Sequence, residues 1–159
     1  MKAIISVKNI STLSQTIKAQ DKTVVLIGGC FDVLHPGHII FLEKAKQEGD
    51  VLVIFLESDQ KIKQTKGQNR PFFNQLERAE VLQAVKFVDF VVLLPFIKKS
   101  SEYDLLIKQL QPNIIAVTAG LNLSNYQRSA QLVGAELKKV TKIIGHYSTS
   151  QILKWGLDK

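Results

Sequence analysis

The sequence has a single cysteine, only four prolines and only nine glycines among its 159 residues. One cysteine, Cys30, cannot form a disulfide within the chain, which excludes a disulfide-stapled secreted scaffold. The low glycine and proline counts, together with 45% apolar and 22% charged residues, exclude collagen-like, low-complexity and mostly disordered chains. The composition is that of a globular protein, and we expect residues 1–159 to form one domain around one core.

The chain also lacks a long hydrophobic run. Its longest apolar stretch, residues 87–97, is interrupted by Asp89 and Pro95 and is shorter than the roughly 20 residues that a membrane span requires. Near the start of the chain an apolar run ends at Ser6, far short of the about 7 to 15 apolar residues of a secretory signal. We therefore expect a cytoplasmic protein with no membrane partner.

Acidic residues are in the minority, because 14 Asp and Glu face 21 Lys and Arg, a formal net charge of +7. This balance favours polyanionic partners such as nucleotides, phosphorylated metabolites or nucleic acid, and it equally fits a basic surface without a specific partner. No strand pattern interleaves aromatic and basic residues, so we do not expect nucleic acid as the partner. Three histidines and one cysteine are too few for a typical zinc site, and we expect no metal held by the protein.

Short runs rich in Val and Ile alternate with segments of helical periodicity. The runs predicted as strands are residues 23–28, 51–57, 88–94, 113–118 and 139–144. Helices are predicted at residues 38–48, 75–86, 101–110 and 124–133, with shorter ones at 11–18 and 148–155. This order predicts a three-layer, Rossmann-like α/β fold, with a parallel five-stranded sheet and helices on both faces. Such sheets bind their ligands beyond the carboxyl ends of the strands.

The turn after the first of these strands carries the clearest binding pattern, GGCFDVLHPGH over residues 28–38. Its two opening glycines let a phosphate approach the backbone closely. A helix that begins near Gly37 directs free N–H groups and the positive end of its dipole at the same space. His35 and His38 lie three residues apart across the helix start, so both rings can donate hydrogen bonds to one phosphate. The turn therefore predicts an anion site.

Each residue of this turn also has a structural interpretation. Phe31 is expected in the core in either case, and Asp32 can hydrogen-bond the backbone of the turn. Cys30 is expected to pack as a small buried residue and not to act as a nucleophile. The two histidines can also be surface residues or, with a third ligand, part of a metal site.

The same turn resembles the GxFDxxHxGH segment of the cytidylyltransferase-like nucleotidyltransferases, through Gly29-Cys30-Phe31-Asp32 and His35-Pro36-Gly37-His38. Three further pieces follow in the order of the family: a basic stretch at residues 58–71, the pair Glu77-Arg78, and the hydroxyl run at 148–150. The resemblance covers about residues 10–155. It is greatest to adenylyltransferases that act on heptose 1-phosphate, with glycerol-3-phosphate cytidylyltransferase and archaeal FAD synthetase as close relatives.

The resemblance implies transfer of AMP or CMP from ATP or CTP to a sugar phosphate or an alcohol phosphate, with release of pyrophosphate, and it favours AMP. It implies catalytic roles for His35, His38 and Lys66. Nucleotide binding is implied for Gly29, Cys30, Phe31, Gly37, Lys63, Arg70, Arg78, Ser148, Thr149 and Ser150. Base or acceptor contacts are assigned to Asp32, Asn122 and His146. Mg²⁺ is expected to be carried by the nucleotide, and relatives that pair imply a homodimer.

Taken on their residues alone, these pieces leave alternatives open. The basic stretch holds four cations and no acid after Asp59, which suits a mobile clamp over phosphates or an exposed basic loop. Arg78 is either a bidentate phosphate ligand or half of a salt bridge on a helix surface. The hydroxyl run forms either a second phosphate cradle or an ordinary helix cap at Ser148.

Two segments depart from the family pattern. Residues 143–146 lack the Arg that cytidylyltransferases carry before the hydroxyl run, which weakens the cytidylyl interpretation. Residues 118–125 lack the acid that relatives place after this strand, so Asn122 or Asn125 would supply base or ribose contacts, and Asn122 is equally suited to a turn. The remaining alternatives are adenylyl transfer to FMN and a nucleotide-binding module without catalysis.

Overall fold

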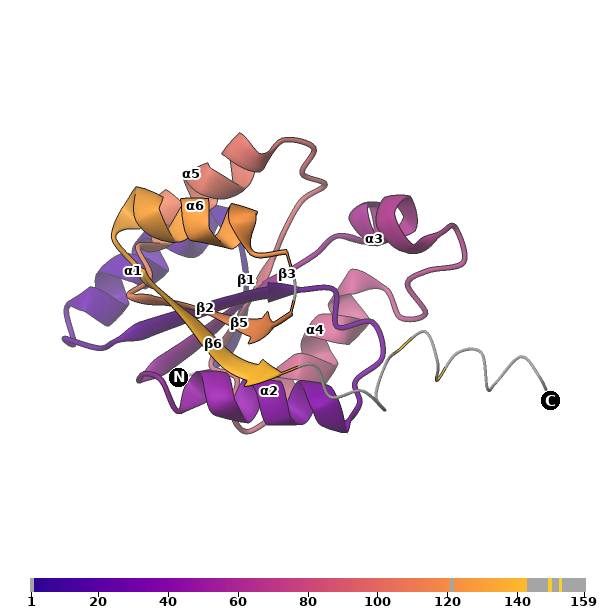
Figure 1. The fold of residues 1–159 in the computed structure, drawn as a ribbon, viewed down its shortest axis with the longest axis horizontal. Helices are drawn as coiled ribbons and strands as arrows, with labels where there is room; N and C mark the ends of the chain where they lie inside the picture. Colours follow the sequence, from indigo (N-terminus) through magenta and orange to yellow (C-terminus); the bar gives the residue numbers. More distant parts are fainter. Residues whose placement is uncertain (1, 121, 143–148, 150–151, 153–159) are drawn as a thin grey trace.

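The computed structural model describes residues 2–120, 122–142, 149 and 152. Within these residues, six parallel strands form one sheet in the order β1-β4-β3-β2-β5-β6, with helices on both faces (Figure 1). The strands are β1 (Ala3–Ser6), β2 (Val24–Gly29), β3 (Val51–Leu56), β4 (Phe90–Leu93), β5 (Ile114–Ala119) and β6 (Glu136–Lys142). The α/β class with a parallel sheet is thus confirmed.

The described helices are α1 (Ile10–Lys18), α2 (Pro36–Lys46), α3 (Asp59–Lys66), α4 (Gln75–Ala84), α5 (Ser100–Leu110) and α6 (Ser124–Val133), and a 3₁₀ turn covers Val7–Asn9. Five of them, α1, α2, α4, α5 and α6, follow the predicted order with small shifts of their ends, and α3 is additional. None of the described helices is long and apolar enough to span a membrane. Most of the helix predicted at 148–155 lies outside the described residues.

The sheet has one strand more than the sequence predicted. The extra strand, β1, pairs with β4 at the edge of the sheet, with Ala3 opposite Phe90. A strand of four residues is too short to show a periodicity of its own. Its place in the sheet depends on pairing with a strand more than 80 residues away, which a local pattern does not reveal.

The basic stretch at 58–71 is only partly a loop. Its first half forms α3, which begins where the Ser58 hydroxyl oxygen accepts a hydrogen bond from the backbone N–H of Lys61 at 3.3 Å. Ile62 is fully buried and anchors the helix, and Gly67, at a φ of 103° that favours glycine, ends it. The expectation of a loop over the whole stretch is therefore wrong, because one buried apolar residue and a serine cap suffice to hold a helix here.

Two hydrophobic clusters cover the two faces of the sheet. Helices α1, α5 and α6 pack on one face, and α2 and α4 pack on the other (Figure 1). Successive strand residues alternate between the clusters, as Leu26 and Ile27 do on β2. Helices α2 and α4, which follow β2 and precede β4 in the chain, lie on one face, whereas α5 and α6, which follow β4 and β5, lie on the other.

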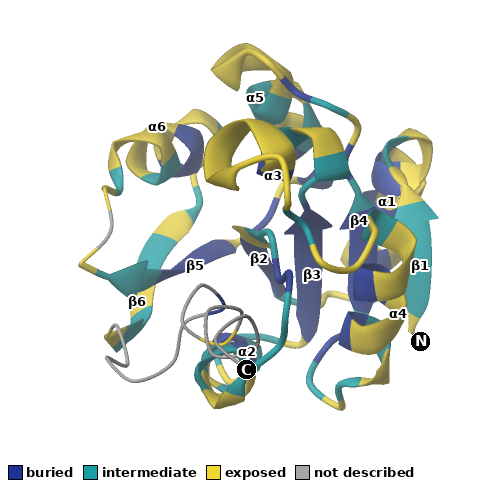
Figure 2. Cartoon of the chain, turned by 90° about the vertical axis from the view of Figure 1, so that its right-hand side faces the viewer, coloured by how far each residue is buried: buried dark blue, intermediate teal, exposed yellow. Residues whose placement is uncertain are grey.

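This change of face places the ligand site. Strand β2 lies between β3 and β5, so the connections diverge from it and leave a crevice at its carboxyl end. Figure 2 looks onto this edge of the sheet, with α3 in front of the ends of the buried central strands. The turn 28–38 follows β2 directly and therefore lies at the crevice.

A buried arginine ties the elements of this edge together. Arg78, on α4, is 1% exposed. Its guanidinium donates hydrogen bonds to the carbonyl oxygens of Cys30, Glu57 (2.8 Å) and Phe73 (3.1 Å) and to the carboxylate of Asp59 (2.7 Å). Since its donors are used by the protein and solvent does not reach it, Arg78 is not placed to bind a nucleotide. Nor is it a residue of the helix surface, so both interpretations from the sequence give way to a structural role.

We predict that Arg78→Met lowers the free energy of unfolding by about 3 kcal/mol or more, because it leaves buried carbonyl oxygens and one carboxylate without a donor. Urea unfolding measures the loss. Arg128→Met is the matched control, because the Arg128 side chain is 48% exposed and, within the described part of the chain, pairs only with Asp104. Its loss should stay below about 1 kcal/mol. Similar small losses for the two variants would contradict the role assigned to Arg78.

Candidate active site

The turn after β2 is shaped by close packing around one aromatic ring. Phe31 is buried in the cluster under α2 and α4, and its φ of 44° is unusual for a residue with a side chain. A Cβ atom on Gly29 would approach the Phe31 ring to 2.7 Å, so this position requires glycine. The backbone of the turn is therefore held close to the carboxyl end of β2 with no side chain at Gly29 in front of it.

Helix α2 begins at the far end of this turn. His35 is its extended N-cap residue and Pro36 its first residue, and no side-chain hydrogen bond caps this end of the helix within the described part of the chain. The positive end of the helix dipole, with Gly37 in its first turn, consequently faces the space beside the turn. This is the arrangement that binds phosphate in many proteins.

The two histidines of the motif lie against each other at this helix end. The rings of His35 and His38 stack with their centroids 3.8 Å apart, and His38 also contacts the Phe31 ring at 5.2 Å. Burial lowers the pKa of both imidazoles. The pKa of the His38 imidazole is lowered to about 4, by burial and by the nearby His35 and Lys66. Both rings are therefore neutral near pH 7 and present a mixture of donors and acceptors to a ligand.

Lysine charges reach the same space from α3. Lys66 lies in the last turn of α3, is exposed, and acts electrostatically on both His38 and Cys30. Lys63, one turn earlier, is also exposed. Burial raises the pKa of the Cys30 thiol, which keeps it protonated and agrees with its interpretation as a packing residue. The structure thus brings Lys66 to the histidine pair.

Arg70 is held beside the turn by an ion pair. Its Nε donates to the carboxylate of Asp32, which also accepts a hydrogen bond from the backbone N–H of Phe72 at 2.7 Å. Asp32 is 3% exposed with both oxygens occupied, so it positions Arg70 and is not available to a base or an acceptor. The Nη2 atom of Arg70 is buried and has no hydrogen-bond partner among the described residues. It remains a donor for an anion.

The remaining predicted residues fall into three groups. Thr149 donates a hydrogen bond from its hydroxyl to the carbonyl oxygen of Val33 at 3.1 Å, which brings it to the turn. Ser148, Ser150 and His146 lie outside the described residues. The carboxamide oxygen of Asn122 accepts from the backbone N–H and the hydroxyl of Ser124, so Asn122 serves as the turn residue at the start of α6. Nucleotide contacts of Thr149 and the others stay predictions.

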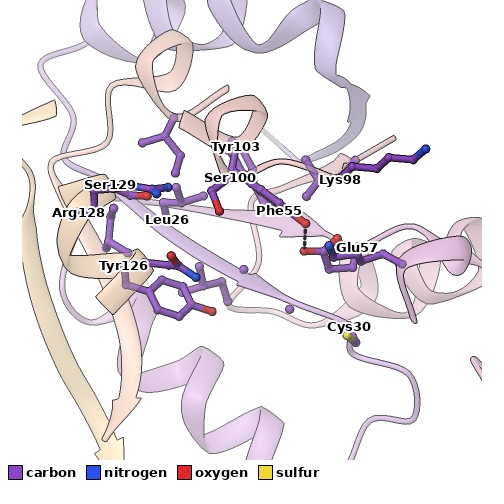
Figure 3. Close-up of a pocket in the computed structure, with 18 residues that line it drawn as sticks. Leu26, Cys30, Phe55, Glu57, Lys98, Ser100, Tyr103, Tyr126, Arg128 and Ser129 are labelled. Carbon is purple, nitrogen blue, oxygen red and sulfur yellow. Dashed lines mark hydrogen bonds between the residues drawn. The ribbon is translucent and has the colours of Figure 1, made fainter. Parts of the chain in front are cut away.

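A pocket of about 400 Å³ opens next to the turn, between the carboxyl ends of β2 and β3 and helices α5 and α6 (Figure 3). Its apolar part is formed by Leu26, Phe55, Leu94, Ile107 and Ile115. Gly28, Gly29 and Cys30 belong both to this pocket and to the turn, so the two spaces are continuous. Its polar residues include Glu57, Tyr103 and Tyr126, none of which was singled out in the sequence.

One signal could have pointed to this pocket. Glu57 directly follows the fully buried strand β3, and an acid at the carboxyl end of a buried strand faces the ligand edge of the sheet. No comparable signal exists for Tyr103 and Tyr126, because they lie on amphipathic helices where an aromatic residue is expected to pack. Among the described residues, no three side chains of the metal-binding types converge.

Two solved structures share this fold. The lipopolysaccharide core biosynthesis protein from Thermoplasma volcanium matches with a TM-score of 0.60 and 24% identity, over 80% of this chain and 99% of that chain. The pantoate-β-alanine ligase from Francisella tularensis, solved with an ATP analogue and β-alanine, matches with a TM-score of 0.63 and 15% identity, over 87% of this chain and 66% of that chain. At these identities the similarity establishes the fold alone.

Sequence comparison identifies nearer relatives. The bifunctional protein HldE of Campylobacter jejuni subsp. doylei is 36% identical over 96% of this chain, and those of Campylobacter fetus and Helicobacter pylori are 42% and 37% identical over 77% and 89%. The chain spans between a quarter and a third of the length of these relatives. A profile described as cytidylyltransferase-like matches residues 26–153, which include the turn, α3 and Thr149. The chain therefore belongs to the cytidylyltransferase-like family of nucleotidyltransferases, as the motif at 28–38 predicted.

Proposed function

We propose that this chain transfers AMP, in preference to CMP, from the nucleoside triphosphate to a sugar phosphate and releases pyrophosphate. The observation that carries the proposal is the stacked His35 and His38 pair at the start of α2, beside Lys66 and continuous with a pocket of acceptor size. The resemblance of residues 28–38 to enzymes that adenylate heptose 1-phosphate supports AMP and a sugar phosphate. The missing Arg in residues 143–146 disfavours CMP.

The two substrates occupy different sides of β2. The triphosphate lies along the turn 28–38 and the start of α2, where backbone N–H groups, the helix dipole and the histidine pair converge. The acceptor fills the pocket on the side of α5 and α6, so that its phosphate meets the triphosphate at Gly29 and Cys30. In this arrangement the oxygen of the acceptor phosphate, which is the nucleophile, reaches the α-phosphorus without a movement of the protein.

The chemistry needs no nucleophile from the protein. An oxygen of the acceptor phosphate, already anionic, forms a bond to the α-phosphorus as the bond to the bridging oxygen of the β-phosphate breaks, and pyrophosphate leaves with that electron pair. The protein aligns the two groups and offsets the charge that develops on the α- and β-phosphates. His35 and His38 donate hydrogen bonds there, and Lys63, Lys66 and Arg70 neutralise the phosphates.

Mg²⁺ enters as part of the nucleotide substrate. Among the described residues, no three metal-binding side chains converge. The Asp32 carboxylate pairs with Arg70, and the Glu57 carboxylate accepts a hydrogen bond from Tyr103 through one of its two oxygens. We expect phosphate oxygens and water to hold the ion, a mode of binding that Mg²⁺ favours.

The first test is pyrophosphate release with MgATP or MgCTP against glucose, mannose and heptose 1-phosphates, glycerol 3-phosphate and FMN. We expect release with ATP and a sugar 1-phosphate. His35→Ala should lower kcat about 100-fold or more, because one preorganised donor contributes roughly 2.7 to 4 kcal/mol to transition-state stabilisation. Lys44→Ala, on the exposed face of the same helix, is the control and should leave kcat unchanged.

Other outcomes separate the alternatives. Release that needs FMN would move the acceptor from a sugar to a flavin. No pyrophosphate release with any acceptor, with ATP binding still seen in calorimetry, would favour a nucleotide-binding module without catalysis. An unchanged kcat in His35→Ala would remove the histidine pair from the mechanism.

Nucleotide binding should also take up protons. The pKa of His38 is about 4 in the free protein, and a triphosphate beside it favours the imidazolium and raises that pKa. At pH 6 we therefore expect His38 to gain a fraction of a proton on binding, so the affinity falls as the pH rises through the pKa of the complex.

Calorimetry of a non-hydrolysable ATP analogue, in buffers of different ionisation enthalpy, measures this uptake. His38→Asn should take up fewer protons than the wild type. Because the nucleotide's own phosphates contribute equally in both proteins, subtracting the two uptakes removes that contribution. The other titratable groups at this position are His35 and Lys66, which both proteins retain. Equal uptake in the two proteins would contradict the placement of the triphosphate at His38.

A further inference from the structure

One carboxylate stands out among the residues that line the pocket. Glu57 is the only acidic residue among the described lining residues, and it comes from the end of β3 at the inner side of the pocket. Its Oε1 accepts a hydrogen bond from the Tyr103 hydroxyl at 2.7 Å, as Figure 3 shows. Its Oε2 is buried and has no hydrogen-bond partner among the described residues.

A buried carboxylate oxygen without a donor is unfavourable, and native structures rarely leave one. The nearby cations do not bond to it. Lys61 donates to the carbonyl oxygen of Ile97 at 3.1 Å, and Arg78 donates to the backbone oxygen of Glu57 and not to its carboxylate. The open acceptor therefore fits a donor that arrives with a ligand.

The surroundings define what kind of donor fits. Burial raises the pKa of the Glu57 carboxyl and, together with Glu57, raises that of the Tyr103 hydroxyl well above its ordinary value, so Tyr103 stays a neutral donor. The Tyr126 hydroxyl points from α6 toward the middle of the pocket (Figure 3). Phe55 and Ile107 supply apolar surface close by. Apolar walls with a few hydrogen-bonding groups match a sugar ring that carries hydroxyl groups.

We propose that Glu57, held by Tyr103, recognises one hydroxyl group of a polyhydroxylated acceptor, whose O–H donates to the free Oε2. This inference rests on the proposed function, because it takes the pocket as the acceptor site. It adds a residue that selects the acceptor: a polyol phosphate satisfies the carboxylate, whereas an acceptor without a hydroxyl at that position leaves it buried and unpaired.

The carboxylate is held firmly enough to discriminate. The backbone of Glu57 is fixed by Arg78 at 2.8 Å, and its side chain is fixed by Tyr103. Since both contacts exist before a ligand binds, little ordering is needed on binding. Glu57 is thus a binding residue for the acceptor, with no part in the transfer itself.

The test uses Glu57→Gln, which keeps the shape of the side chain and removes its charge. With MgATP and the sugar 1-phosphate that the wild type uses best, we expect KM for the acceptor to rise about 10-fold or more, as for loss of a hydrogen bond to a charged group. KM for ATP should stay within about twofold. Glu48→Gln is the control: Glu48 pairs with Lys138 at 2.8 Å, away from the pocket lining, and its KM values should not change.

A set of monodeoxy analogues of mannose 1-phosphate sharpens the result. One analogue should bind the wild type about 10-fold more weakly than mannose 1-phosphate, and it should lose little further affinity in Glu57→Gln, since the partner hydroxyl is already absent. The inference would be overturned if, for every analogue, the affinity loss caused by the missing hydroxyl multiplied with the loss caused by Glu57→Gln. An unchanged acceptor KM in Glu57→Gln would also overturn it. Urea unfolding verifies that both variants fold.

Calorimetry separates this inference from the proposed function. If the wild type releases no pyrophosphate with any acceptor, the proposed function fails, and the binding of mannose 1-phosphate and heptose 1-phosphate alone is measured. A Kd weakened about 10-fold or more in Glu57→Gln would still support hydroxyl recognition. Equal Kd values, or no binding of either sugar phosphate to the wild type, would overturn it.

Discussion

The carboxyl edge of this sheet depends on a single buried guanidinium. Arg78 reaches from α4 to the ends of β2 and β3, to α3 and to the segment before its own helix. Through Cys30 it holds the phosphate turn, and through Glu57 it holds the inner side of the pocket. Because a planar group with fixed donors sets these distances, the turn and the pocket keep one relative position before any ligand binds.

Near Arg78, the site holds two kinds of group that favour an anion. The desolvated donors, which are the histidine pair and the Arg70 guanidinium paired with Asp32, are held by packing or by an ion pair. Lys63 and Lys66 of α3, in contrast, are exposed. Half-buried donors define where a phosphate lies, whereas exposed lysines neutralise its charge and are released at a small cost. A transferase that must bind and release several anions in one cycle needs both.

The sequence predicted those features that local patterns encode and missed those that depend on tertiary contacts. The strands from β2 to β6 and the turn at 28–38 were predicted because apolar runs and glycines carry their own signal. Strand β1 was missed because it is defined by its pairing with β4, and α3 was missed because one buried residue, Ile62, holds it. The roles of Arg78 and Asp32 could not be predicted, since a polar residue in a helix or turn gives no sign that its partners lie 19 to 48 residues away.

The central claim is that the protein aligns and neutralises phosphates and contributes no nucleophile. The stereochemical course at the α-phosphorus tests this most directly. With ATP made chiral by an α-phosphorothioate, and the sugar 1-phosphate that supports pyrophosphate release, one in-line displacement inverts the configuration. The account predicts inversion. Retention would require two displacements through an enzyme-bound nucleotidyl intermediate, and it would contradict the account.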